Sequence, residues 1–137
     1  MKNFYVKQAL ELLKKSPLKS TEQRKDLIKI LFKKGDNHFT AEEIHSQVLD
    51  KNYNVSLATI YNSLKQFTSF GIIKIIKTST EKMYFDTNIK PHHHFYFKDS
   101  GELLDISDDQ INISELPDIP RNNKVDSVEV VISLSKK

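Results

Sequence analysis

The sequence predicts an α+β fold in which an N-terminal winged helix-turn-helix precedes a small α/β domain. Apolar residues recur at helical spacing through the first 70 residues, and two runs of β-forming residues then flank a polar turn at residues 78–81. Helices followed by a two-stranded hairpin form the winged version of the helix-turn-helix. We therefore expect a winged helix over residues 1–86, a hinge over 87–91 and a second domain over 92–137.

Two helices are predicted within the first 35 residues. Residues 4–15 have helical apolar spacing, and Pro17 ends this helix. Ser20 and Gln23 match a capping box, in which a hydroxyl and an amide satisfy free backbone N–H groups, so the second helix begins there and ends near Gly35. The side chains expected to face inward are Tyr5, Ala9, Leu12, Leu13, Leu27, Ile28, Leu31 and Phe32.

Two further helices complete the predicted helix-turn-helix. Thr40 and Glu43 match a second capping box, which starts the third helix. Ser56 starts the fourth helix over residues 57–70, with Gly71 at its C-terminal cap. This last helix is the expected recognition helix. The inward-facing residues of the two helices are predicted to be Ile44, Val48, Leu57, Ile60, Leu64 and Phe67.

Short β-type runs dominate the rest of the chain. A loop or a short helix is expected over residues 108–124. A sheet of a few short strands leaves open edges and a small core, so a second copy should cover it. A homodimer also fits the two-fold symmetry of palindromic double-stranded DNA operators. The predicted strands lie at residues 72–77, 82–86, 92–98, 102–106 and 125–134.

Charge and composition exclude several classes of site. The chain has no cysteine, which excludes disulfides, thiolate zinc sites and cysteine nucleophiles. Residues 1–90 hold 16 basic against 9 acidic residues, whereas residues 91–137 hold 5 against 9. The basic part is typical of a nucleic-acid binder, although a solvated lysine face is an equally simple interpretation. With no membrane-spanning run and no signal peptide in the sequence, we expect a cytoplasmic protein without a membrane partner.

Polar residues suited to DNA contacts lie on the outer face of the predicted recognition helix. Tyr61 can stack on thymine methyl groups or reach a phosphate, and Asn62 can read adenine. On these residues alone, the polar outer face of a surface helix is the favoured interpretation. Basic residues near the first turn could follow the backbone or enter the minor groove, although a solvated surface would have the same composition. The candidate DNA-binding residues are Lys14, Lys15, Lys19, Arg24, Ser56, Thr59, Tyr61, Asn62 and Lys65.

A run of three histidines is the most informative cluster for chemistry. In a strand, His92 and His94 share one face, with Cα atoms about 7 Å apart. Asp86 precedes them, and Asp105 on the partner strand could face the pair. Such a nitrogen and oxygen set suits Fe²⁺, Mn²⁺ or Zn²⁺. An exposed or hydrogen-bonded histidine run is as good an interpretation of the same residues.

Six stretches of the chain, taken in order, resemble the ferric uptake regulator family of bacterial repressors. The resemblance implies an N-terminal winged helix, a C-terminal dimerisation domain and DNA affinity controlled by metal, and therefore a regulator and not an enzyme. The alternatives are a small His/Asp metal- or haem-binding enzyme, which would activate water, and a winged-helix module that binds protein. The matching stretches are residues 18–24, 38–44, 56–61, 70–73, 92–94 and 101–106.

The resemblance also implies a ligand set for the regulatory metal. One ligand from the DNA-binding side of the hinge would let the metal fix the orientation of the winged helix. The sequence departs from the family where many members have paired CxxC motifs, since residues 97–100 contain no cysteine and no structural zinc held by four cysteines is expected. A further site of some members is expected to be lost, because Pro91 replaces a histidine. The implied metal ligands are His38, Asp86, His92, His94 and Asp105.

Within the family, the chain is similar to the iron response regulator branch. The similarity rests on the lack of cysteine, on the pair Tyr61 and Asn62, and on the strand pattern of residues 125–131. This branch implies control of iron and haem genes, with haem as a second candidate signal. Without a Cys-Pro motif, haem would need two histidines or one histidine and another ligand. The candidate haem ligands are His92, His93 and His94.

Overall fold

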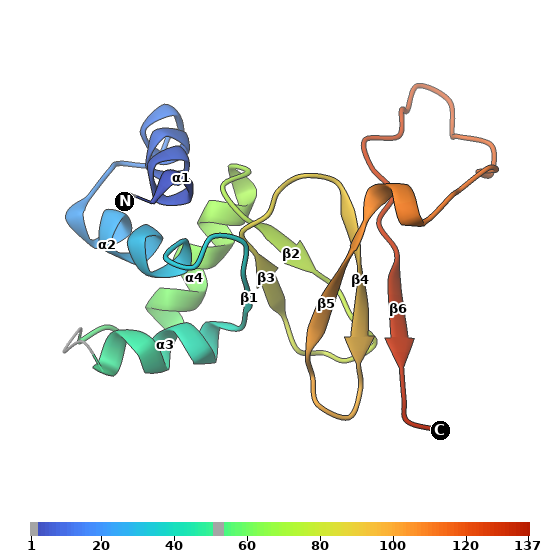
Figure 1. Cartoon of the computed structure of the whole chain (residues 1–137). Helices are drawn as coiled ribbons and strands as arrows, with labels where there is room; N and C mark the ends of the chain where they lie inside the picture. The colour runs from blue at the N-terminus through green and yellow to red at the C-terminus, as the bar shows by residue number, and fades with distance from the viewer. Residues whose placement is uncertain (1–2, 51–53) are drawn as a thin grey trace. The chain divides into compact units, whose positions relative to one another are not determined.

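The computed structural model of the chain describes residues 3–50 and 54–137. The chain forms two compact units, Met1–Ile89 and Lys90–Lys137. The division lies inside the expected hinge over residues 87–91. Figure 1 shows the helices and strands of each unit along the chain. Among the described residues, no helix has the length and apolar character needed to cross a membrane.

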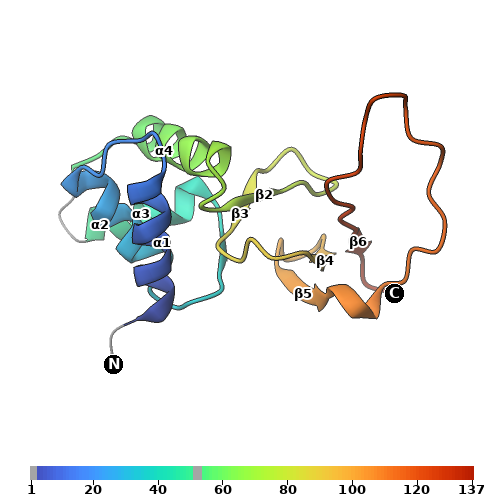
Figure 2. The ribbon, with the colours of Figure 1, turned by 90° about the horizontal axis from the view of Figure 1, so that it is seen from above.

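The described residues of the first unit form four helices, which Figure 2 shows from above. Polar side chains cap the N-termini of these helices. The capping box at the third helix is confirmed, because Thr40 N donates to Glu43 Oε1 at 3.1 Å and Glu43 N donates to Thr40 Oγ1 at 3.2 Å. Ser56 caps the fourth helix by accepting from Thr59 N. The helices are α1 Phe4–Lys15, α2 Glu22–Leu31, α3 Ala41–Asp50 and α4 Leu57–Ser69.

The second helix begins one residue later than the sequence pattern predicted. Its N-cap is Thr21 and not Ser20, since the Thr21 hydroxyl accepts from Arg24 N at 3.2 Å. Threonine is also a good N-cap residue. The shift brings the Glu22 carboxylate into the first turn, where it interacts favourably with the positive end of the helix dipole.

The core of the first unit lies between the helices and one face of a small sheet. The predicted inward positions are wrong at three residues, because the exposed fractions are 43% for Tyr5, 37% for Leu12 and 39% for Leu57. The residues of α1 that face the core are instead centred on Ala9 and Leu13, which are fully buried. The partly buried neighbours of the core on the same helix are Val6 and Leu10, which keep the helical spacing.

The sheet of the first unit is a wing with one more strand than predicted. The hairpin is confirmed, with β2 Lys74–Ile76 antiparallel to β3 Tyr84–Asp86 and both strands shorter than expected. The added strand β1, His38–Phe39, pairs antiparallel with the other side of β3, so the order is β1-β3-β2. Two residues are too few to show a strand pattern in the sequence, yet this pairing positions His38.

The second unit contains one mixed sheet of order β5-β4-β6. Its strands are β4 His92–Phe97, β5 Leu103–Ser107 and β6 Val131–Leu134. The strands β4 and β5 are antiparallel, whereas β6 runs parallel to β4. The final strand was expected from residue 125 but begins at Val131. A short 3-10 helix, Asp108–Gln110, precedes a connection over residues 111–130 that contains neither helix nor strand.

The second unit has little hydrophobic core of its own. Within residues 90–137, all of which the structure describes, only Tyr96 and Ile106 are buried apolar side chains. Large aliphatic side chains are instead exposed on β5, on β6 and along the connection that leads to β6. These exposed residues are Leu104, Ile113, Leu116, Ile119, Val125, Val128 and Ile132.

Candidate metal centre and DNA-binding face

The outer face of α4 presents polar side chains to solvent. Asn62 and Lys65 are exposed and lie one helical turn apart. The hydroxyls of Ser56 and Thr59 are exposed and 2.9 Å apart at the N-terminus of the helix. A helix N-terminus with exposed hydroxyls can bind phosphate groups. These four candidate DNA-binding residues therefore share an accessible surface of α4.

Tyr61 differs from its neighbours on α4 because it is half-buried against the core of the first unit. Its hydroxyl donates a hydrogen bond to Met83 Sδ at 3.4 Å, just before β3. The Nζ atom of Lys65 lies 5.6 Å from the centre of the tyrosine ring, which is a cation–π contact. Tyr61 thus connects the recognition helix to the wing.

The remaining basic candidates surround α1 and α2. Lys14 and Lys15 are exposed in the last turn of α1, and Lys19 is exposed in the following loop. Arg24 is partly held, since its guanidinium donates to Lys19 O at 3.0 Å and to Gln66 Oε1 at 3.4 Å. The second contact joins α2 to α4. Arg24 therefore also supports the position of the recognition helix.

The first unit holds a pair of candidate metal ligands on neighbouring strands. His38 on β1 lies directly opposite Asp86 on β3, with His38 Nε2 3.6 Å from Asp86 Oδ2. The Asp86 carboxylate is buried, and its Oδ1 accepts a hydrogen bond from Asn88 N at 2.9 Å. The His38 side chain stays 22% exposed. The pairing of β1 with β3 therefore brings together two ligand types that are far apart in the sequence.

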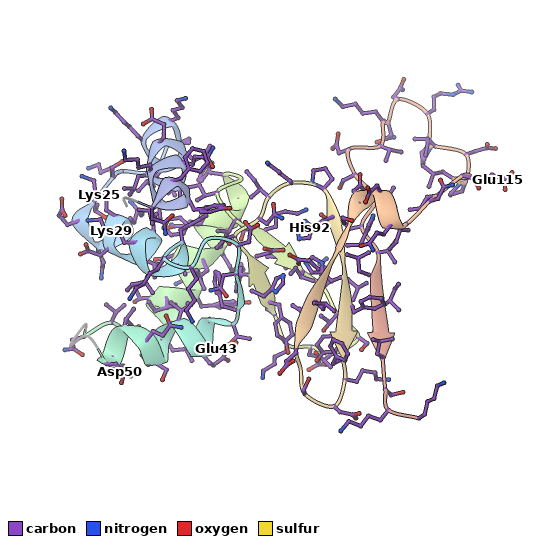
Figure 3. The ribbon with its side chains drawn as sticks, viewed as in Figure 1. Lys25, Lys29, Glu43, Asp50, His92 and Glu115 are labelled. Carbon is purple, nitrogen blue, oxygen red and sulfur yellow. The ribbon has the colours of Figure 1, made fainter. Side chains whose placement is uncertain are left out.

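The second unit holds three candidate ligands on one face of its sheet. His94 on β4 lies opposite Asp105 on β5, and His92 shares the face because alternate strand residues point the same way. His92 Nε2 is 3.5 Å and His94 Nε2 is 3.3 Å from Asp105 Oδ1. Each of these residues offers a ligand atom within 4.8 Å of the other two. In Figure 3, His92 is labelled on β4.

The hydrogen bonding of His92 bears on whether the three candidate ligands of the second unit are suited to bind a cation. A carbonyl oxygen can only accept, so the 2.6 Å contact with Lys90 O requires the proton on His92 Nδ1. In neutral His92, Nε2 then has a lone pair that faces the Asp105 carboxylate. A nitrogen in this position can serve as a ligand atom for a cation that the carboxylate also binds, whereas a doubly protonated ring would form an ion pair with Asp105. A hydrogen bond from the outer ring nitrogen is also the usual support of a metal-bound histidine.

His93 belongs to the opposite face of β4. Its Nδ1 accepts from Val130 N at 2.9 Å, and its Nε2 donates to Asp108 Oδ1 at 3.1 Å. The side chain is 2% exposed. Both ring nitrogens are therefore engaged in joining β4 to the residues before β6 and to the 3-10 helix. The structure does not bring His93 together with His92 and His94 as one set of candidate haem ligands.

The donor chemistry of the two groups favours hard or borderline divalent ions. The five side chains offer imidazole nitrogens and carboxylate oxygens and no sulfur. Such sets suit Fe²⁺, Mn²⁺ and Zn²⁺, whereas thiolate and thioether ligands select Cu⁺. Local sequence patterns indicated four of these residues, whereas His38 was indicated only by the family resemblance. The strand β1 that positions His38 has only two residues and is too short to be visible as a pattern in the sequence.

Comparison with known proteins identifies the family. The profile of the ferric uptake regulator family matches residues 15–134. The ferric uptake regulation protein of Klebsiella pneumoniae is 31% identical over 104 residues, which cover 75% of this chain and 67% of that protein. The peroxide-responsive repressor PerR of Staphylococcus epidermidis is 30% identical over 107 residues, covering 78% and 71% of the two chains.

A solved structure supports the fold. The ferric uptake regulator of Pseudomonas aeruginosa, determined with manganese, has a TM-score of 0.73 and 23% identity, and the match covers 93% of this chain and 96% of that one. The predicted α+β fold with a winged helix is thereby confirmed. The family profile and the curated relatives, which are regulators, do not favour a small metalloenzyme. The chain therefore belongs to the ferric uptake regulator family and is a metal-responsive, DNA-binding transcription regulator, not an enzyme.

Proposed function

We propose that the two ligand groups bind one divalent ion per subunit and that this ion joins the two units. The first unit offers two ligands and the second offers three, so neither group alone supplies five protein ligands. The hinge over residues 87–91, with Pro91 inside it, separates the groups in sequence. An ion held from both sides would fix the orientation of the winged helix. The ligands of this proposed site are His38, Asp86, His92, His94 and Asp105.

The observation that carries this proposal is the convergence of two imidazoles on one carboxylate oxygen, since His92 Nε2 and His94 Nε2 lie 3.5 Å and 3.3 Å from Asp105 Oδ1. The contact of His92 Nδ1 with Lys90 O orients the ring so that Nε2 points toward the Asp105 carboxylate. A divalent ion could be held by these nitrogen and oxygen atoms together. The Pseudomonas aeruginosa relative was determined with manganese, which fits the same kind of donor set.

Control of DNA binding follows from linkage. When bound, the ion supplies a cross-link between ligands on both sides of the hinge. If DNA selects one orientation of the winged helix, an ion that stabilises this orientation raises DNA affinity. DNA must then raise the affinity for the ion by the same factor. His38 and Asp86 would link the ion to the first unit and so carry this coupling. The ligands on the second unit would determine how fully the site is occupied; they are His92, His94 and Asp105.

We further propose that two copies bind a palindromic double-stranded DNA site. A recognition helix from each copy would enter the major groove of one half-site. Asn62 would read base edges, while Ser56, Thr59 and Lys65 would contact phosphates. The apolar side chains exposed on the second unit, including Leu116 and Ile119, would form the contact between copies.

Iron and haem homeostasis is the process that we propose for the regulated genes. The support is the lack of cysteine, the Tyr61–Asn62 pair and the pattern of residues 125–131, on which the similarity to the iron response regulator branch rests. Because the ring nitrogens of His93 are already hydrogen-bonded, His92 and His94 are the better candidates if haem is a ligand. Genome-wide mapping of bound sites with and without iron tests the assignment. Sites away from iron and haem genes would contradict it.

The metal site is tested by removing one ligand from each unit. His38→Ala should leave a partial site that still binds an ion but no longer links it to the winged helix. His92→Ala should lower metal occupancy itself, because the second unit loses one arm of a chelating pair. Metal content and operator affinity are measured for both variants at buffered free Mn²⁺. Metal-dependent DNA binding that survives His38→Ala would refute the proposed link.

A further inference from the structure

Thr87 is a buried residue that follows the candidate ligand Asp86. It is 6% exposed. Its hydroxyl accepts a hydrogen bond from Asn37 N at 2.8 Å and donates to Gly35 O at 3.0 Å. Its backbone N–H donates to Asn37 O, also at 3.0 Å. Thr87 thus bonds to the loop that leads into β1 through both its side chain and its backbone, and its hydroxyl also lies 3.4 Å from Asn37 O.

These hydrogen bonds extend the pairing that holds the first ligand pair. Asn37 precedes His38, and Thr87 follows Asp86, so the bonds add one position to the register of β1 and β3. The strand β1 has only two residues, and few ladder bonds therefore define its position. Without the Thr87 hydroxyl, Asn37 would lose a hydrogen bond next to His38, and β1 would be held less firmly against β3.

The loop that Thr87 contacts is itself closely packed. Gly35 has a φ of +78°, and a Cβ atom there would lie 3.0 Å from Cε2 of Tyr5. Gly35 N also donates to Phe32 O at 3.0 Å, which ties the loop to the end of α2. The Asn3 side chain donates to the same carbonyl at 2.8 Å. Thr87 therefore connects the ligand strands to a fixed part of the helical core.

We infer that Thr87 is a positioning residue, whose hydroxyl holds His38 and Asp86 in the geometry that binds the divalent ion. This inference rests on the proposed metal-dependent function and goes beyond it, because Thr87 is not among the proposed ligands. Outer residues that orient metal ligands typically change metal affinity about 10- to 100-fold when they are replaced. Thr87 should therefore set the free metal concentration at which the regulator responds.

The chemistry of the hydroxyl selects the variants for a test. Valine has nearly the shape of threonine but can neither accept from Asn37 N nor donate to Gly35 O. Thr87→Val therefore leaves two backbone groups without the partner they have now. Thr87→Ser keeps the hydroxyl and loses only a methyl group. The pair separates the hydrogen bonds from the packing of the side chain.

The experiment titrates the full-length protein on an operator duplex with buffered Mn²⁺ and follows fluorescence anisotropy. Thr87→Val should raise the Mn²⁺ concentration at half-maximal binding by roughly tenfold or more, while DNA affinity at saturating Mn²⁺ stays near that of the parent protein. Thr87→Ser should remain near the parent value. A general loss of stability would instead lower DNA affinity at every metal concentration. An equal midpoint in the valine and serine variants would overturn the inference.

His38→Ala, measured in parallel, separates this inference from the proposed function. If His38→Ala abolishes the Mn²⁺ response and Thr87→Val leaves it unchanged, only the role of Thr87 is wrong. If His38→Ala leaves the response intact, the proposed function is wrong whatever Thr87 does. Should Thr87→Val fail to fold, Thr87→Ala is titrated in its place, since it removes the same hydroxyl with a smaller side chain. A parent-like midpoint in that variant would also overturn the inference.

Discussion

The hydroxyl of Tyr61 on the recognition helix donates to the thioether of Met83, 3.4 Å away beside the wing. The tyrosine ring is half-buried and contacts the core of the first unit. The orientation of α4 relative to the wing therefore depends on a side chain that the sequence singled out for base reading. Substitution can separate the structural role of Tyr61 from a role in reading bases.

Tyr61→Ala should weaken binding at the cognate operator by about 1–3 kcal/mol. Tyr61→Phe should cost clearly less, because the ring keeps its packing and only the bond to Met83 is lost. Operator affinity by anisotropy, with thermal unfolding as the control for stability, distinguishes the two variants. A phenylalanine variant as weak as the alanine variant would mean that the hydroxyl itself contacts DNA.

Asn62→Ala should relax the sequence preference of DNA binding. It should leave the stability of the fold nearly unchanged, because Asn62 is exposed on α4. Loss of one base contact is expected to cost about 1–3 kcal/mol at the matched base pair. Competition between the operator and single-base variants measures this discrimination. Ser69→Ala is a control on the same helix, because Ser69 is exposed and its hydroxyl bonds to Lys65 O within the helix. Unchanged discrimination in Asn62→Ala would show that another face of α4 reads the bases.

Lys19→Ala should weaken binding to all sequences by a similar factor if Lys19 meets a phosphate. The slope of log affinity against log salt concentration should then fall by about one. Binding is measured across a salt series on the operator and on a random duplex. A selective loss at A·T-rich sites would instead place Lys19 in the minor groove.

His93→Leu should destabilise the second unit by about 1–3 kcal/mol, because Val130 N loses its acceptor inside the structure. Metal stoichiometry should stay the same, since His93 lies on the other face of β4 from the proposed ligands. Chemical denaturation and metal analysis provide the two measurements. The matched control is Asp108→Asn, which keeps an acceptor for His93 Nε2 and should change little.

Ile119→Glu should weaken self-association, since the exposed aliphatic side chains of the second unit are the proposed contact between copies. The parent protein should sediment at about twice the 15.9 kDa of one chain. Ser127→Glu adds the same charge to the same connection without removing an apolar group, and it should remain dimeric. A parent protein that binds DNA as a stable monomer at micromolar concentration would contradict the proposal.

Local chemistry explains which parts of the fold could be predicted from the sequence. The bonds between Thr40 and Glu43 span three residues, so the pattern is visible in the sequence and is confirmed. Ser20 and Thr21 are adjacent and both able to cap a helix, and only the final backbone conformation chooses between them. In α1, Tyr5 fits the helical period, but packing favours a stripe through Ala9 and Leu13.

The candidate site shows the same division between local and distant information. Strand alternation was enough to place His92 and His94 on one face and to suggest Asp105 opposite them. The pair of His38 and Asp86 depends instead on contact between segments that are distant in the sequence. No periodic pattern can reveal that contact, because β1 has only two residues.

The parallel pairing of β6 with β4 has a consequence for the order of folding. The adjacent strands β4 and β5 close through a tight turn, whereas the bond between Val130 and His93 joins residues 37 positions apart. Closing the longer loop costs more chain entropy, so the hairpin should form first and β6 should dock later. Until β6 docks, one edge of the central strand β4 is unpaired and can capture the strand of another molecule. The slowest step in forming this sheet is therefore also the interval in which the protein is most prone to aggregate.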